Sequence, residues 1–530
     1  MAIRFKHFVR DVSPPYLAGL LALIYFVSLT FDISIFAINL ISFLGLGVAV
    51  DYSLLLVNRF REELNHWPKE EAVSRTLTTS GKTILFAALT SALGLSSLLI
   101  FNFMMLRSLG LGGILVITVS LLLALTLIPA ILAVVGHQVN ALPILHTRTR
   151  GPAYWRGLAL TAMRHPFFVA IPMIILLLVL GTPFVTVKLG SPWASILPEN
   201  AASRQGWDMV SENIGPGEIS PIVALVTLSD PTSPLNGSAP LRQLVHTLER
   251  DSRVDRIESI FTPAPASFGM SSLPQHPTNK AIEGYIRGDT TVIQVFSRYS
   301  PVEDESRELV KYIRSLNPNP EFNILVTGAT ADLMDSIDLM YSDFPKAIGF
   351  VLATVYVVLL LLFRSVLLPL KAVVMNLMSI FASYGALVFI FQQGHLQAFL
   401  GFRTEGFTEA TLPILLFAVI FGLSMDYEIF LLSRIKESHD ASGNNTESVA
   451  QGLEVTGPII TSAAIILILV ATAFASADII IIKALGLGTA IAIFIDATVV
   501  RALLVPALMQ IMGRWNWWAP SLLRRSIPQW

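Results

Sequence analysis

Two acidic side chains stand out because they lie inside apolar runs long enough to cross a membrane. Asp51 and Asp426 each precede by eight residues the arginine that ends the run, Arg59 and Arg434 respectively. At a rise of 1.5 Å per residue, each carboxyl group is expected ~12 Å below the membrane surface. A carboxylate there costs about 2.5 to 3.5 kcal/mol on insertion scales, so such residues usually serve a function. The alternative is a structural Asp that stays protonated or is hydrogen-bonded to a neighbour.

A tyrosine follows each of these aspartates. Tyr52 and Tyr427 lie about 100° around the helix from the preceding carboxyl group, so neither can face its own aspartate. If the two helices lie side by side about a two-fold axis, Asp51 meets Tyr427 and Asp426 meets Tyr52. Burial and like charge both disfavour ionisation, so protonation near neutral pH is feasible, and phenol hydroxyls can serve as hydrogen-bond partners. Asp51, Tyr52, Asp426 and Tyr427 are therefore candidates for a site that binds and releases protons.

Two further pairs are candidates for supporting roles. Gly47 and Gly422 lie one turn before the aspartates on the same helix face, and we predict that they let the two backbones approach closely. Ordinary small packing residues are an equally good interpretation of these glycines. Asp496 and Arg501 lie in the last apolar run, and we interpret this secondary polar pair as a structural ion pair, with a role in coupling as the alternative.

The sequence lacks the patterns of enzymatic or metal chemistry. Cysteine is absent, and the nine histidines do not fall at ligand spacings such as HExxH, so we predict no metal site. No hydrolase triad is visible, and we expect no catalytic residue, no cofactor and no enzyme activity. The net charge of -1 does not provide a basic field for a nucleic-acid partner.

The composition indicates a protein whose solvent is a lipid bilayer. Hydrophobic residues make up 53% of the chain and charged residues 14%, and the mean hydropathy is +0.66. We predict a multi-pass α-helical membrane protein of about ten transmembrane helices in two pseudo-symmetric halves. The apolar runs lie at roughly 15–31, 35–57, 83–103, 109–135, 167–186, 346–363, 367–391, 412–432, 458–476 and 479–510.

Residues 187–345 differ from the rest because they are rich in Pro, Gly, Ser, Asp and Glu. Strand-like runs at 222–228, 291–296 and 322–326 alternate with helix-like runs at 241–250 and 304–316. This order predicts one α+β, porter-like domain. The expected divisions are first-half helices at 1–136, a cytoplasmic linker at 137–166, a transmembrane helix at 167–186, the α+β domain at 187–345, second-half helices at 346–513 and a cytoplasmic tail at 514–530.

Positive charge predicts the orientation, because Lys and Arg in short loops stay in the cytoplasm. Every second connection is basic, which places both termini inside and the 187–345 domain outside. The protein is therefore expected in the cytoplasmic (inner) membrane of the cell. The basic residues that carry this prediction are Arg4, Lys6, Arg10, Arg59, Arg61, Lys69, Arg75, Lys82, Arg148, Arg150, Arg156, Arg164, Arg364, Lys371, Arg434, Lys436, Arg514, Arg524 and Arg525.

An internal repeat relates the two halves. Residues 47–59 align with 422–434, and Gly, Asp, Tyr and Arg fall in register. The match resumes at Gly81 against Gly457 and at 109–112 against 485–488. Both copies end in a basic loop, so the repeats share one orientation. The second half also has a helix, a domain and a further helix before its last four spans, and we expect the first half to lack these.

These segments resemble the MmpL family of the resistance-nodulation-division superfamily. Residues 31–63 look like the fourth-helix region of that family, and residues 363–371, 422–434 and 496–507 look like its second-half signatures. The resemblance implies export of lipids, glycolipids or related hydrophobic molecules, driven by the proton motive force and relayed by the Asp-Tyr pairs. Relative to that family the first helix, the first outer domain and the second helix are expected to be missing, so either a separate N-terminal polypeptide supplies them or the chain is a truncated remnant.

Three functions therefore follow from the sequence. The first is a proton-driven exporter subunit whose partners are a lipid or hydrophobic cargo, protons and a separate N-terminal half. The second is a lipid-sensing or sterol-sensing membrane regulator that does not pump. The third is a non-functional fragment of such a transporter.

Overall fold

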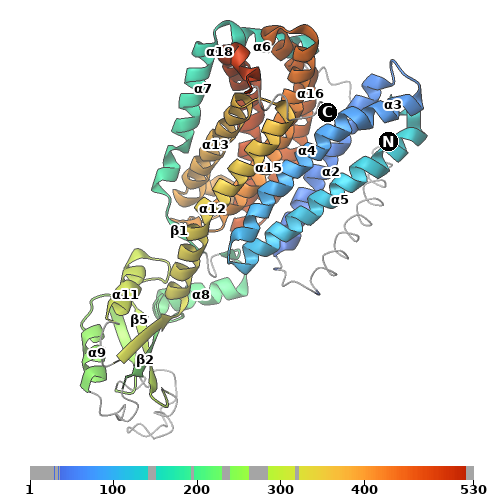
Figure 1. Ribbon diagram of the computed structural model, residues 1–530. Helices are drawn as coiled ribbons and strands as arrows, with labels where there is room; N and C mark the ends of the chain where they lie inside the picture. The colour runs from blue at the N-terminus through green and yellow to red at the C-terminus, as the bar shows by residue number, and fades with distance from the viewer. Residues whose placement is uncertain are drawn as a thin grey trace. The chain divides into compact units, whose positions relative to one another are not determined.

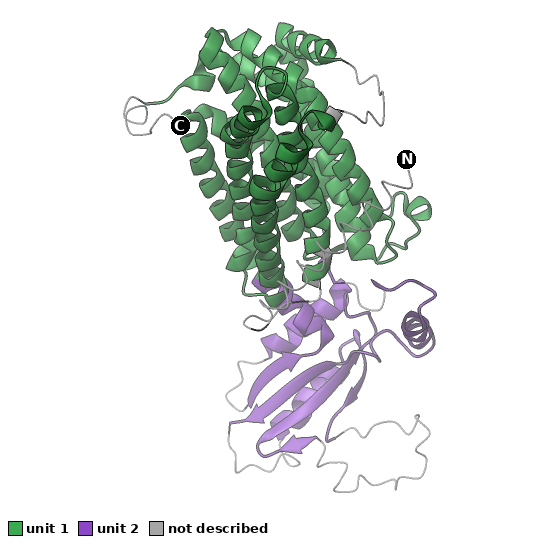
Figure 2. Cartoon of the chain, turned by 90° about the vertical axis from the view of Figure 1, so that its right-hand side faces the viewer, with its two compact units in different colours: residues 1–188, 340–530 green, residues 189–339 purple. Residues whose placement is uncertain are grey.

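The computed structural model describes residues 29, 34, 36–140, 151–191, 196–229, 239–261, 285–316 and 322–520. The predicted span at 15–31 and the residues Asp32 and Ile33 lie outside this description, apart from Leu29. The basic residues Arg4, Lys6, Arg10, Arg148, Arg150, Arg524 and Arg525 also lie outside it. The described chain divides into two compact units, residues 1–188 with 340–530 and residues 189–339, which Figure 2 colours green and purple.

The first unit is a bundle of long apolar helices. Among the described residues, nine helical segments are long and apolar enough to cross a membrane. This confirms a multi-pass helical membrane protein, whose first expected span falls in the part not described. The segments are Ile41–Glu63, Lys69–Ile100, Met104–Val139, Pro166–Thr186, Ala329–Phe363, Leu367–Gln392, Leu412–Ser442, Asn445–Ala475 and Ile480–Trp517.

The helices of the first half lie together (Figure 1). Helix α2 packs along α5 and also contacts α16, and α4 packs along α15. Helix α6 packs on α16, and α7 packs on α13. The bounds of the first-half helices are α2 Phe36–Glu63, α3 Lys69–Thr76, α4 Lys82–Ser96 and α5 Met104–Val135; the two helices that follow them are α6 Pro152–Arg164 and α7 Pro166–Gly181.

Helix α15 lies in the interior of the second half. Every residue from Leu412 to Leu432 is buried, because α4, α13, α16 and α17 pack around it. The bounds are α12 Ala329–Phe363, α13 Leu367–Leu387, α14 Gln397–Leu400, α15 Leu412–Ser442, α16 Asn445–Ala475, α17 Ile480–Ile495 and α18 Val505–Met512. A π-helical segment, η8 (Asp496–Leu504), joins α17 to α18.

One expectation about the loops is wrong. Lys371 was assigned to a basic connection at the membrane surface, but it lies in α13 and is only 7% exposed. Helix α13 begins at Leu367, so the connection after α12 is only three residues long and Lys371 lies in the second turn of the helix.

The second unit is a small α+β domain. Its sheet has the order β3-β5-β2-β6, and these neighbouring strands pair in the antiparallel sense. In β2, alternate residues from Ile222 to Leu228 are buried, which is the period expected of a strand with one face on a core. These residues pack with apolar side chains of α9 and α11 in one core. The bounds are α8 Ala202–Asn213, β2 Ile222–Leu228, α9 Ala239–Glu249, β3 Val254–Glu258, β4 Ile286–Arg287, β5 Thr290–Ser297, α11 Asp304–Ser315 and β6 Phe322–Thr327.

The three strands and two helices expected from the sequence are confirmed in this unit. Four elements were missed, namely β1 (Leu189–Gly190), α8, β3 and β4. Strand β3 contains an irregularity in its pairing between Val254 and Arg256, which breaks the alternation of apolar and polar residues that marks a strand.

Candidate functional site

The two central helices place both aspartates in the protein interior. Asp51 of α2 is 6% exposed and Asp426 of α15 is 8% exposed. Each lies within a helix that has the length and hydropathy of a membrane span. Helical periodicity explains these positions, because both helices are apolar on most faces and their few polar side chains can turn only toward neighbouring helices.

A hydrogen bond joins the two halves at this point. The Tyr427 hydroxyl donates to Asp51 Oδ2 across the bundle. The predicted contact between Asp51 and Tyr427 is therefore confirmed. The second predicted contact is looser: the Tyr52 hydroxyl lies beside Asp426 and interacts with that carboxyl group, but the geometry falls short of a well-formed hydrogen bond.

Asp426 has a different partner, which the sequence analysis missed. The Ser91 hydroxyl of α4 donates to Asp426 Oδ1 at 2.7 Å. The repeat that aligns Gly81 with Gly457 places Leu467 opposite Ser91, so the first-half aspartate lacks an equivalent donor. A serine in a membrane helix is common, and only the packing of α4 on α15 shows which carboxyl group it reaches.

The two glycines pack against helices other than those expected. A Cβ atom on Gly422 would lie 3.1 Å from Ser91 Cα, and one on Gly47 would lie 2.7 Å from the side chain of Leu467. The expectation that they bring α2 and α15 together is therefore wrong. Gly422 instead allows α15 to approach α4, and Gly47 leaves room for a leucine of α16, in two contacts that the repeat relates.

The polar pair Asp496 and Arg501 belongs to the same cluster. The two side chains form a buried ion pair, and Ser424 of α15 donates to Asp496 Oδ2 at 2.7 Å. Arg501 also donates to the Ser424 carbonyl at 2.6 Å, and its guanidinium carbon lies 4.8 Å from the centre of the Tyr427 ring.

The π-helical backbone explains why these two residues meet. In an α-helix, residues five apart point about 140° away from one another. In η8 the backbone hydrogen bonds run between residues five apart, so Asp496 and Arg501 lie one above the other. The pairing therefore depends on a local change of helix type that the sequence does not reveal.

A second pair of charged residues lies beside this cluster and was also missed. Lys371 is 7% exposed and Glu428 is 3% exposed. They interact electrostatically, and Glu428 also interacts with Asp496 and Arg501. Neither Lys371 Nζ nor Glu428 Oε1 has a hydrogen-bond partner among the described residues.

The charges of this buried cluster do not balance. It contains four carboxyl groups, on Asp51, Asp426, Glu428 and Asp496, and two cationic groups, on Lys371 and Arg501. If all six are ionised, two negative charges remain without a partner in a region of low polarity, which is costly. Binding of protons removes this cost, so the cluster can take up and release protons. These described side chains do not resemble a nucleophile with its base.

Comparison with known proteins agrees with this architecture. The chain is 34% identical over 96% of its length to the mycolic acid-containing lipids exporter MmpL11 of Mycolicibacterium smegmatis, of which it covers 52%. It is 35% identical over 96% to the membrane protein SCO6666 of Streptomyces coelicolor, covering 67%. It is 31% identical over 96% to the trehalose monomycolate exporter MmpL3 of Mycobacterium tuberculosis, covering 55%. The chain thus spans about half the length of the two exporters.

The family model described as "MMPL family" matches residues 16–169 and 195–530. Those ranges include both central helices, the Asp-Tyr pairs and the ion pair of η8. Together with identities of 31% to 35% over 96% of the chain, this match shows that the chain belongs to the MMPL family of RND-type membrane proteins.

Proposed function

We propose that this chain is part of a transporter that exports lipids or other hydrophobic molecules across the cytoplasmic membrane and is driven by protons. In this proposal Asp51, Tyr52, Asp426 and Tyr427 form the proton relay, and the neighbouring ion pair of Asp496 and Arg501 supports it. The relatives named as lipid exporters support the class of cargo.

One observation carries the proposal, namely the buried contact between Asp51 and Tyr427 within a cluster of uncompensated carboxyl groups. The two residues belong to different halves of the repeat. An ionised carboxylate accepts a hydrogen bond more strongly than a protonated one. The strength of this link between the halves therefore changes when a proton binds.

The available driving force is sufficient for rocking of the two halves. Each proton that crosses the membrane contributes about 2.3 kcal/mol per 100 mV and about 1.4 kcal/mol per pH unit. A charge-assisted hydrogen bond of the Asp51–Tyr427 type contributes about 1.5 to 3 kcal/mol. The free energy released when one proton crosses the membrane can thus outweigh the loss of this hydrogen bond.

We propose that the transport unit contains more than this chain. The two named exporters are almost twice as long as this chain. A further helix, outer domain and helix would complete the first half of the repeat, either within one longer polypeptide or from a separate one. In this proposal both termini and the 59–82 connection are cytoplasmic and the α+β unit lies outside, which the positive-inside pattern supports.

Transport in proteoliposomes tests the function. The complete transport unit, reconstituted with a fluorescent lipid and a pH gradient, should move lipid in the wild-type form. Asp51→Asn and Asp426→Asn should each abolish proton-coupled movement, because Asn keeps the shape but cannot titrate. Both variants should insert in nearly normal amounts.

Thr118→Val is a suitable control. Thr118 lies on an exposed face of α5, and its hydroxyl bonds only to the carbonyl of Ile114 in its own helix, so transport should persist. Full transport by the double Asn variant would contradict the relay. Wild-type protein that binds lipid but moves none under a pH gradient would instead indicate a lipid-sensing regulator.

A further inference from the structure

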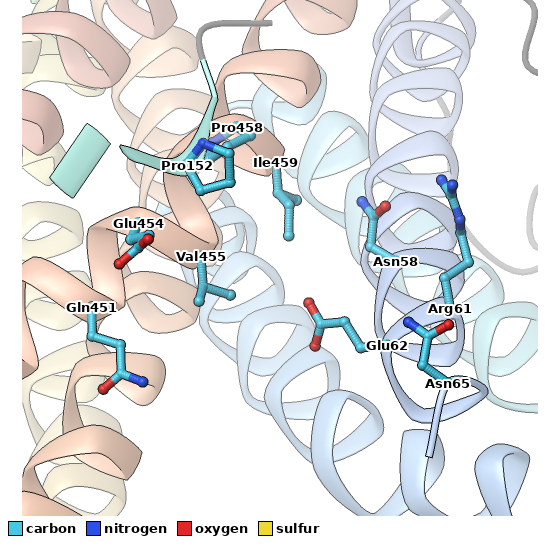
Figure 3. Close-up of a pocket in the computed structure, with 10 residues that line it drawn as sticks. All are labelled: Asn58, Arg61, Glu62, Asn65, Pro152, Gln451, Glu454, Val455, Pro458 and Ile459. Atoms are coloured by element: carbon cyan, nitrogen blue, oxygen red, sulfur yellow. The ribbon is translucent and has the colours of Figure 1, made fainter. Parts of the chain in front are cut away.

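A water-accessible cavity opens between the carboxyl end of α2 and the first half of α16. Its volume is about 740 Å³, which at about 30 Å³ per molecule is room for about 25 waters. Figure 3 shows polar side chains of α2 on one wall facing side chains of α16 on the other. The lining residues are Asn58, Arg61, Glu62, Asn65, Pro152, Gln451, Glu454, Val455, Pro458 and Ile459.

The cavity lies on the same face of α2 as Asp51. Asn58 follows Asp51 by seven residues, which is about two helical turns or about 10 Å along the axis. Side chains of a helix tilt toward its N-terminus, so Asn58 points back toward the aspartate. The turn between them is occupied on this face by Leu55, which is 6% exposed. On this face of α2, Leu55 therefore lies between the lining residue Asn58 and Asp51.

Helices α2 and α16 pack tightly in the part of α2 that precedes Asp51. There, Gly47 faces Leu467 so closely that an added Cβ would lie 2.7 Å from the leucine. Asp51 thus lies between a tight contact and an open cavity. Water that passed Leu55 from this cavity would therefore meet a closed contact beyond the carboxyl group.

The equivalent pair of helices in the other half is packed more tightly. Helices α15 and α4 approach backbone to backbone, since a Cβ on Gly94 would lie 3.1 Å from the Ala418 carbonyl oxygen and 3.5 Å from Gly422 N. Contacts between α15 and α4 are also more extensive than those between α2 and α16. The two halves therefore differ in how easily water can reach the aspartate. The more open helix pair is the one that contains Asp51.

Two buried polar atoms near the inner end of this path lack partners. Asp51 Oδ1 and the Tyr52 hydroxyl are buried and make no hydrogen bond to the described side chains or backbone. Buried polar groups in folded proteins are nearly always satisfied, commonly by bound water. Water that reaches Asp51 from the cavity would supply the missing partner.

We propose that this cavity is an aqueous vestibule through which protons pass between Asp51 and the cytoplasm, and that Asn58 positions the innermost water. The inference rests on the proposed function and on the cytoplasmic placement of the 59–82 connection. When the Asp51 carboxylic acid releases its proton to water, a hydronium ion forms and the carboxylate remains hydrogen-bonded to Tyr427. The proton then moves by exchange along the waters to the solvent.

Three of the residues that line the vestibule are charged, namely Arg61, Glu62 and Glu454. Glu62 forms ion pairs with Arg59 and with Arg434 of α15, both at 3.2 Å. Glu454 pairs with Arg156 of α6 at 3.3 Å. These pairs hold the two carboxylates at the walls, so neither blocks the space between α2 and α16.

The absence of cysteine permits a direct test of water access. Leu55 and Phe430 are equivalent in the repeat, and both are buried, at 6% and 3% exposure. In inside-out vesicles containing the complete transport unit, a small charged methanethiosulfonate should react with Leu55→Cys at least about tenfold faster than with Phe430→Cys. A tenfold ratio of rates corresponds to a difference of about 1.4 kcal/mol in the activation free energy of the labelling reaction. Equal slow rates at the two positions would overturn the vestibule.

A second pair of variants tests the role of Asn58. Asn58→Leu should slow proton flux by about tenfold or more, because one hydrogen bond to the innermost water is lost. Asn58→Ser keeps a polar group and should retain most of the flux. Equal flux in the Leu and Ser variants would contradict the positioning role.

The outcomes separate this inference from the proposed function. If Asp51→Asn abolishes transport while Leu55→Cys reacts as slowly as Phe430→Cys, the relay stands and the vestibule is refuted. If Leu55→Cys reacts rapidly while Asp51→Asn transports normally, the cleft is hydrated but both the relay and the proton route are refuted.

Discussion

The contact between Tyr427 and Asp51 leads to a quantitative prediction about stability. Tyr427→Phe removes the hydroxyl that donates to Asp51 Oδ2 and leaves the rest of the ring in place. Because Oδ1 already lacks a partner, both oxygens of this buried carboxyl group would then be unsatisfied. Tyr52→Phe is the matched control, since the Tyr52 hydroxyl makes no hydrogen bond in the described structure.

The magnitude follows from the type of bond that is lost. A hydrogen bond to a charged group contributes about 1.5 to 3 kcal/mol, and a donor without a partner contributes little when it is removed. At a pH at which the Asp51 carboxyl group is ionised, Tyr427→Phe should therefore lower the free energy of unfolding by about 1.5 to 3 kcal/mol. Tyr52→Phe should change it by less than about 0.5 kcal/mol.

Equilibrium unfolding in mixed detergent and dodecyl sulfate micelles measures both effects. A double-mutant cycle with Asp51→Leu isolates the pair, because Leu removes the acceptor and keeps the branching of the side chain at Cγ. The coupling energy with Tyr427→Phe should be about 1.5 kcal/mol or more, and with Tyr52→Phe close to zero. Equal losses for the two Phe variants, or additivity of Asp51→Leu with Tyr427→Phe, would refute the reasoning.

Three further predictions concern packing, pH and orientation. Gly385→Ala should destabilise the helix bundle by about 1 to 3 kcal/mol in the same unfolding assay, because a Cβ there would lie 1.9 Å from a backbone oxygen of α7; Gly349→Ala, which meets nothing within 4 Å, should not. The hydrogen bond from Arg253 holds the pKa of the Asp251 carboxyl group below its usual value. The ionised Asp251 carboxylate therefore stabilises the fold above pH ~4, and this stabilisation is lost as the pH falls below that value. Asp251→Asn should accordingly lower the melting temperature more at pH 7 than at pH 3. An impermeant thiol reagent applied to intact cells should label Ser252→Cys of the α+β unit and not Ser74→Cys, and the opposite pattern would reverse the orientation.

Several features of this protein were predictable because they depend on the local chain. The lengths of the apolar runs identified the membrane helices, since about 20 residues are needed to span the hydrocarbon. The strand-like run at 222–228 identified β2, and the structure shows that alternate residues of this strand are buried, because side chains of a strand alternate between its two faces. The pairing of Asp51 with Tyr427 followed from the helical angle between adjacent residues together with the two-fold relation of the repeats.

Other features were decided only by the tertiary structure. The sequence did not indicate that Ser91 reaches Asp426, that Lys371 is buried near Glu428, or that Gly422 packs against α4. Hydropathy reports that a residue lies in a membrane helix and not which neighbour it faces. In a bilayer, that choice depends on close packing spread over many small contacts, because lipid offers apolar side chains as good a solvent as another helix does. The asymmetry of the site, with a donor for Asp426 from α4 and an open cavity beside α2, therefore arises from helix packing that a repeat in sequence does not determine.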